Sequence, residues 1–106
     1  MGAPKKKKID KAVQQILATL QTEYGVKHPK AKIEAYRFNP ASIRIRIVDP
    51  DFAKKGLLQR EKLVDPILKT LPEDIQADIM FLLLLTPKER ETSFGSMEFD
   101  SPVFSR

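Results

Sequence analysis

Cysteine is absent from the 106 residues of this chain, and histidine occurs once, at position 28. The lack of cysteine excludes a disulfide framework, a thiolate zinc site, an all-cysteine iron–sulfur ligand set and a cysteine nucleophile. A single histidine excludes most histidine-based acid–base and metallohydrolase sites. There is also no glycine-rich nucleotide loop of the Walker or Rossmann type. We therefore expect no enzyme, no catalytic residue, no metal site, no cofactor and no small-molecule substrate.

Long hydrophobic runs are lacking as well. The longest, Ile79 to Leu85, is far too short to span a bilayer. The lysine run near the start is not followed by the apolar segment of a secretory signal, so we expect a cytoplasmic protein without membrane association. Paired carboxylates lie at the ends of predicted elements, where such residues cap and terminate them. We interpret these pairs as structural: Asp49/Asp51, Glu73/Asp74 and Glu89/Glu91.

Positive charge is in excess and unevenly distributed. The chain carries 19 Lys+Arg against 14 Asp+Glu, a net charge of +5. Residues 1–64 hold 15 of the cations and 6 of the acids, whereas residues 65–106 hold 4 and 8. A basic surface fits acidic partners such as nucleic acid. The run Lys5 to Lys8 predicts a disordered arm, which either keeps the protein in solution or steers phosphate groups toward it.

Hydrophobic periodicity predicts the first three elements. Residues Ile9 to Glu23 have the spacing of an amphipathic helix, and Gly25 follows at a position that favours a left-handed cap. Two strands, Ala31 to Phe38 and Ser42 to Val48, flank a turn over residues 39–41. In the second strand isoleucines alternate with Arg44 and Arg46, which predicts one buried and one solvated face.

The second half predicts two more helices and a strand. Residues 52–55 lead into a helix whose apolar positions are Leu57, Leu58, Leu63, Val64, Ile67, Leu68 and Leu71. Pro66 either kinks this helix or starts a new one capped by Asp65. A short helix from Pro72 to about Ala77 precedes the strand Ile79 to Leu85, which is apolar on both faces.

The element order α-β-β-α-α-β predicts an α+β fold, a three-stranded mixed sheet with helices packed on one face. We expect a basic arm over residues 1–8, a domain over 9–87 and a tail over 88–106 that is partly packed or disordered. The second apolar face of the last strand needs a cover, because each exposed side chain of this size forfeits about 1.5–3 kcal/mol. Either a second copy of the chain covers it or the tail does, with Phe94, Met97, Phe99, Val103 and Phe104.

Several motifs resemble the BolA family, whose fold is related to the type II KH fold. They are Phe52, Gly56, the Arg-x-x-Leu-Val sequence of residues 60–64 and the Thr-Pro-x-Glu sequence of residues 86–89. Family members that share an iron–sulfur cluster with a monothiol glutaredoxin use a histidine at the start of the last strand, and some use a Cys or His in the loop between the first strands. Here Asp78 and the loop Asn39-Pro40-Ala41 hold those positions. The resemblance therefore implies the scaffold without the metal chemistry, and His28 lies outside the motif.

The cations of the second strand and second helix are the predicted site. Two lysines and a glycine at a helix N-terminus favour an anion, because backbone N–H groups and the helix dipole point outward there. The predicted nucleic-acid-binding residues are Lys54, Lys55, Gly56, Arg60, Lys62, Arg44 and Arg46. The predicted function is that of a non-enzymatic BolA-like regulatory domain that binds RNA or DNA. The alternative is a protein–protein adaptor, glutaredoxin-related or homodimeric, that docks through the third strand or the tail.

Overall fold

The computed structural model describes residues 10–102. Three strands form one sheet in the order β1-β2-β3, with β1 antiparallel and β3 parallel to β2. This is the predicted α+β architecture with a mixed three-stranded sheet. The elements along the chain are α1 (Lys11–Leu20), a π-helical turn (Gln21–Gly25), β1 (Lys32–Asn39), β2 (Ser42–Val48), a 3-10 turn (Pro50–Phe52), α2 (Leu57–Leu68), α3 (Glu73–Asp78), β3 (Ile79–Leu85), α4 (Pro87–Thr92) and α5 (Phe94–Asp100).

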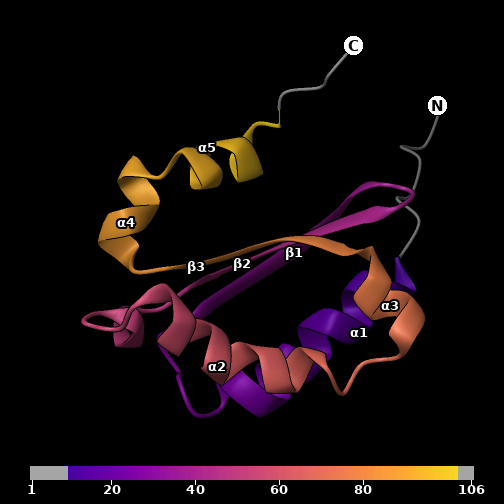
Figure 1. Cartoon of the computed structure of the whole chain (residues 1–106), viewed down its shortest axis with the longest axis horizontal. Helices are drawn as coiled ribbons and strands as arrows, with labels where there is room; N and C mark the ends of the chain where they lie inside the picture. The colour runs from indigo at the N-terminus through magenta and orange to yellow at the C-terminus, as the bar shows by residue number, and fades with distance from the viewer. Residues whose placement is uncertain (1–9, 103–106) are drawn as a thin grey trace, which may run out of the picture.

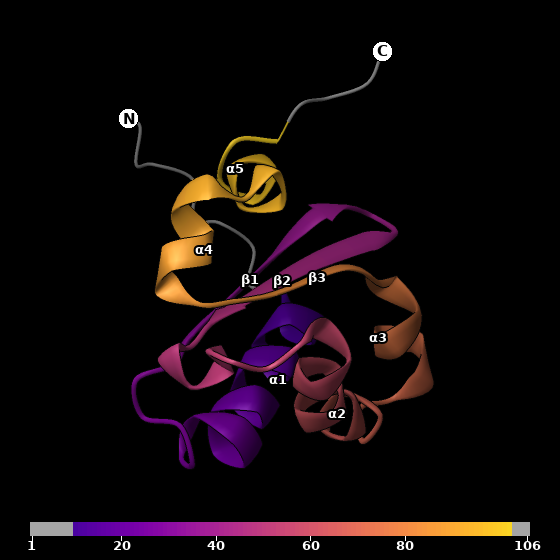
Figure 2. The same cartoon turned by 60° about the vertical axis from the view of Figure 1, so that its left-hand side comes forward.

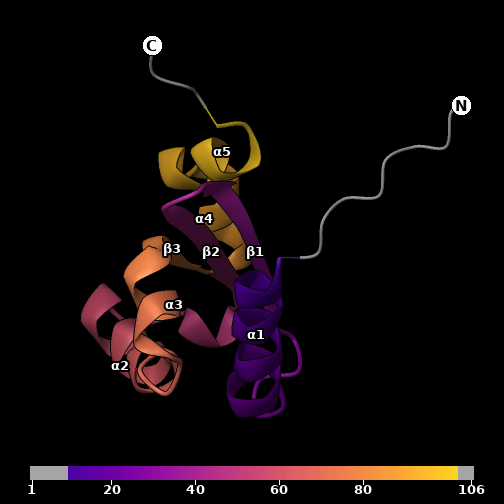
Figure 3. The ribbon, with the colours of Figure 1, turned by 90° about the vertical axis from the view of Figure 1, so that its right-hand side faces the viewer.

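One face of the sheet carries the main core. Helices α1, α2 and α3 cover this face, as Figures 1 and 3 show from two sides. Ile43, Ile45 and Ile47 project into it from β2 and are completely buried, as their alternation predicts. They meet Ile16 and Leu20 of α1 and further residues of α2, α3 and the turns, including Val64, Leu68, Leu71, Ile75, Tyr24 and Phe52.

The opposite face is covered by the C-terminal segment. Helices α4 and α5 lie there, across the sheet from α1 and α2 (Figure 2). Phe99 of α5 is buried, with its ring edge-on to Tyr36 of β1 and tilted against Phe81 of β3. The expected cover of the third strand is therefore present within one chain, and helices occupy both faces once the tail is included. Val103 and Phe104 of the tail, like Ile9 and the lysine arm, fall outside the described residues.

The structure decides three points that concern the ends of the elements. Helix α1 runs on into the π-helical turn, and Gly25 keeps a negative φ, so the left-handed cap expected there is wrong. Pro66 lies inside α2, which continues to Leu68 as one helix. The tail forms two short helices because Thr86 and Ser93 cap their first turns, each accepting from the backbone N–H three residues on. Within residues 10–102, no helix has the length and apolar character that crossing a bilayer demands.

Candidate nucleic-acid interface

The loop of residues 53–56 connects the 3-10 turn to α2 and presents the predicted lysines. Lys54 is exposed and adopts a left-handed backbone conformation with φ of 67°. Lys55 donates from Nζ to the carbonyl of Asp51 at 3.1 Å. Gly56 caps α2, its N–H donates to Gln59 Oε1, and nothing lies within 4 Å of where its Cβ would be. The start of α2 is thus open to solvent beside two lysines.

Arg60, also predicted to bind nucleic acid, is instead a buried structural residue. Its guanidinium donates to both carboxylate oxygens of Glu89, at 2.6 and 3.1 Å. It also donates to the carbonyls of Leu84 and Lys55, and it lies over the ring of Phe52. Glu89 in turn accepts from the N–H of Thr86. The residues of the two family-like motifs therefore contact one another and fasten α2 to the end of β3, which leaves Arg60 no free donor face for a phosphate.

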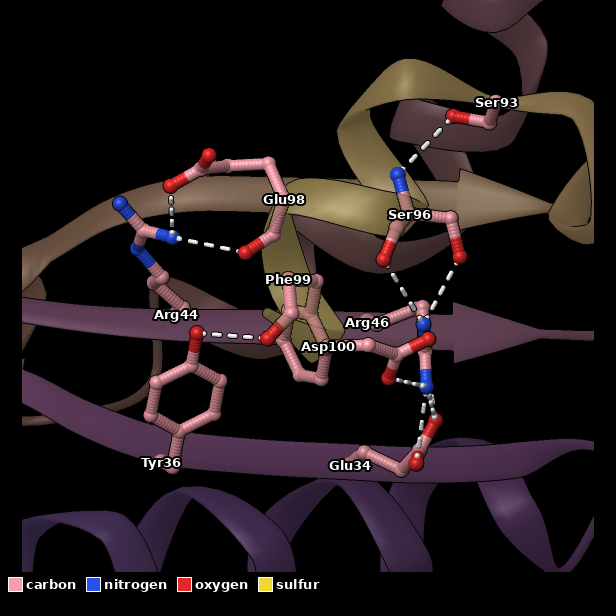
Figure 4. Close-up of polar contacts among 9 residues, drawn as sticks. All are labelled: Glu34, Tyr36, Arg44, Arg46, Ser93, Ser96, Glu98, Phe99 and Asp100. Atoms are coloured by element: carbon pink, nitrogen blue, oxygen red, sulfur yellow. Dashed lines mark hydrogen bonds and ion pairs between the residues drawn. The ribbon is translucent and has the colours of Figure 1, made fainter. Parts of the chain in front are cut away.

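Arg44 and Arg46 do not lie on a solvated face, contrary to the alternation argument. Figure 4 shows both guanidinium groups beneath α5. Arg46 is completely buried and is held by Glu34 at 2.8 and 3.1 Å, Ser96 Oγ at 2.7 Å and Asp100 at 3.0 Å. Arg44 pairs with Glu98 at 3.0 Å and stacks over the ring of Phe38. The acidic tail neutralises these two arginines, which explains part of the charge asymmetry along the chain.

Lys62 and two leucines extend the exposed surface of α2 near the loop. Lys62 is exposed, as predicted. Leu57 and Leu58 are 64% and 65% exposed, so their placement on the buried face of this helix was wrong. The buried positions of α2 are Arg60, Val64 and Leu68, spaced four residues apart, so the first of them is filled by an arginine and not by an apolar residue.

One end of the sheet collects the cations. Lys32 at the start of β1 pairs with Val48 at the end of β2, and Val48 pairs with Leu85 at the end of β3. The connector before β1, the loop before α2 and helix α4 therefore all leave the same end of the sheet, at the left of Figure 1. We call this the basic end. Its cations are Lys27, Lys30, Lys32, Lys54, Lys55, Lys88 and Arg90.

Arginine and lysine have separate roles among residues 10–102. Every ion pair of that range is made by His28 or by Arg37, Arg44, Arg46 or Arg60. No lysine in the same range takes part in one. Four of the five arginines in this range thus hold the fold together, whereas Arg90 and the lysines keep their charges for solvent or a ligand.

The single histidine belongs to a hydrogen-bonded cluster at the basic end. His28 Nδ1 lies 2.8 Å from Asp51 and 3.5 Å from the buried Asp49, close enough for these three side chains to surround a metal ion. The oxygens of Asp49 are already occupied, because one accepts from the N–H of Asp51 and the other from the Tyr24 hydroxyl at 2.5 Å. Burial and Asp49 raise the pKa of Tyr24, which keeps this donor protonated. The cluster ties the connector to the loop before α2.

The positions at which the family-like motif implies cluster ligands lie at the other end of the sheet. Asp78 is 3.3 Å from Arg37, which also pairs with Asp10 and donates to the carbonyl of Pro40 in the β1–β2 loop. The structure thus brings Asp78 and residues 39–41 to one place, with an arginine between them. Neither position offers a histidine or cysteine.

No family model matches the chain, and no curated protein matches it. Among solved structures, BolA1 from Arabidopsis thaliana is similar at 22% identity and a TM-score of 0.47, covering 76% of this chain and 98% of that one. A bol-like protein from Babesia bovis is similar at 21% identity and a TM-score of 0.45, covering 81% of this chain and 94% of that one. Both carry the name of the family that the sequence motifs resemble.

Proposed function

We propose that the protein is a non-enzymatic module that binds nucleic acid through the basic end. The observation that carries this proposal is the convergence of unpaired lysines from three separate connections at that end. The acids of the same segments are largely committed elsewhere: Asp49 and Asp51 to Tyr24 and His28, and Glu89 to Arg60. A phosphate backbone supplies the regularly spaced negative charge that such a surface attracts.

The start of α2 adds two features to this surface. Its first residues are exposed beside Lys54, and the backbone N–H groups of a helix N-terminus favour a phosphate. Leu57 and Leu58 lie exposed next to the lysines and offer apolar area to a sugar or a base. Of the predicted residues, Lys54, Lys55, Gly56 and Lys62 stay in the proposal, whereas Arg44, Arg46 and Arg60 leave it because they hold the fold together.

The test measures binding of fluorescent RNA and DNA oligonucleotides as salt is raised from about 50 to about 200 mM. Phosphate contacts predict an affinity that falls steeply with salt, and Lys54→Glu/Lys55→Glu should weaken it strongly. The matched control is Lys11→Glu/Lys69→Glu, which makes the same charge change at the opposite end of the sheet. Absence of binding at low salt, or equal loss in both double variants, contradicts the proposal.

A second candidate is a protein adaptor that docks at β3. This strand is at the edge of the described sheet, and its Met80 is 67% exposed. An exposed edge can pair with a strand of another protein. Met80→Lys should abolish such docking and leave nucleic-acid binding unchanged, so the two functions separate in one variant.

A further inference from the structure

A cavity of about 300 Å³ lies at the basic end. It is lined by Lys30, Lys32, Val48, Pro87, Arg90 and Glu91. These residues come from the connector, from β1, from β2 and from α4, and the strand pairing Lys32–Val48 brings them together. The volume is at the lower end of the range for small-molecule sites.

Arg90 is the unusual member of this lining. Its Nε is buried and has no hydrogen-bond acceptor anywhere in residues 10–102. A buried donor of this kind normally has a partner. Lys30, Lys32 and Arg90 also make no ion pair within the described range.

The acids near the cavity do not balance these cations. Glu91 is the one acid in the lining, and it is exposed. Asp100 on α5 is the other acid that these cations influence. The largest cause that lowers the pKa of Asp100 is the hydrogen bond that it accepts from Arg46. The positive charges of Arg90 and Lys32 lower this pKa further. Since Asp100 is committed to Arg46, two lysines and an arginine face one uncommitted carboxylate.

We propose that this cavity binds a phosphate group, with Arg90 as its principal donor and Lys30 and Lys32 as flanking charges. Val48 and Pro87 form an apolar wall on which the attached sugar can lie. This inference rests on the proposed function, because it makes the cavity a second phosphate subsite for a nucleic acid whose strand also contacts the α2 loop. A phosphorylated small molecule presents the same chemistry, so the experiment must separate the two sources.

The experiment follows backbone amide NMR signals and binding affinity in the full chain, with inorganic phosphate, adenosine monophosphate and a short oligouridylate as separate probes. The variants are Arg90→Gln and Lys30→Gln/Lys32→Gln, and the control is Lys69→Gln at the far end of α2. Arg90 has no partner to lose, so Arg90→Gln should fold normally. We expect it to weaken oligouridylate binding about tenfold and to lower the salt slope by about 0.7, as loss of one single-strand phosphate contact does.

The outcomes distinguish the failure of the cavity site from the failure of the proposed function. If Arg90→Gln and the double lysine variant bind oligouridylate as tightly as the wild type, the cavity site is overturned. The proposed function is not contradicted by this result. Phosphate or the mononucleotide could shift the signals of residues 30, 32 and 90 while the oligonucleotide does not bind. This result supports the cavity site and overturns the proposed function. No shift with any probe overturns both.

Discussion

The ion pair between Arg60 and Glu89 gives the sharpest test of how this fold is held together. We expect Glu89→Gln to keep the hydrogen bond from the Thr86 N–H, because the amide oxygen can still accept it. The amide nitrogen cannot accept from Arg60, so a buried guanidinium loses its charged partner. The variant therefore isolates the charge from the helix cap.

An upper bound on the magnitude follows from the pKa of Glu89, which the hydrogen bonds from Arg60, first, and from the Thr86 N–H lower from its ordinary value of 4.5 to about 2. A shift of that size corresponds to about 3 kcal/mol at 1.36 kcal/mol per pKa unit. The Glu89 side chain is 45% exposed, and solvent screening reduces the expected loss to about 2 kcal/mol. Because the pKa is lowered in the fold, this stability is fully present above pH 4.5 and is lost as the pH falls toward 2.

Urea unfolding of the wild type and Glu89→Gln at neutral and at acid pH measures this difference. Glu91→Gln is the matched control: it removes one carboxylate from the same helix, and Glu91 makes no ion pair within residues 10–102. We expect the control to stay within about 0.5 kcal/mol of the wild type. A similarly small loss in Glu89→Gln at neutral pH, or a loss that persists unchanged in acid, would show that the charge of Glu89 does not stabilise the fold through Arg60.

Three further predictions concern the two faces of the sheet. Phe99→Ala removes the ring packed between Tyr36 and Phe81 and should lower the free energy of unfolding by about 3 kcal/mol. Truncation after Glu91 should raise the binding of a hydrophobic dye. An unchanged melting temperature in both variants would show that α5 is not part of the fold. Tyr24→Phe removes a donor from the buried Asp49 and should cost about 1–3 kcal/mol by the same assay, whereas a neutral result would mean that water replaces the hydroxyl. Arg90→Gln should leave the stability unchanged or raise it, because the buried Nε has no acceptor among residues 10–102; a loss above about 1 kcal/mol would give Arg90 a structural role.

The local sequence pattern was sufficient to predict the strands β2 and β3. Residues 42–48 and 79–85 form β2 and β3 as expected, because alternation and a short apolar run bounded by turn residues are local signals. The environment of Arg44 and Arg46 was not predictable in the same way. Alternation says which residues share a face, but the cover of that face comes from α5, some 50 residues along the chain.

The sequence also contains a local signal for the first tail helix, α4, in the motif of residues 86–89. Thr86 and Glu89 have the spacing of a capping box, which marks the start of α4. Of the proposed binding residues, Lys54 and Lys55 can be selected from the sequence because they precede a predicted helix. Lys30, Lys32 and Arg90 could not, since only the strand pairing brings them together.

The division between arginine and lysine has a consequence for chemical modification. Acetylation acts on lysine and removes its charge, and it leaves arginine untouched. Acetylating every lysine in residues 10–102 would break none of the ion pairs in that range and one side-chain hydrogen bond, from Lys55 to Asp51. The lysine charges of the basic end can therefore be neutralised while the ion pairs of the fold stay in place and Arg90 keeps its charge.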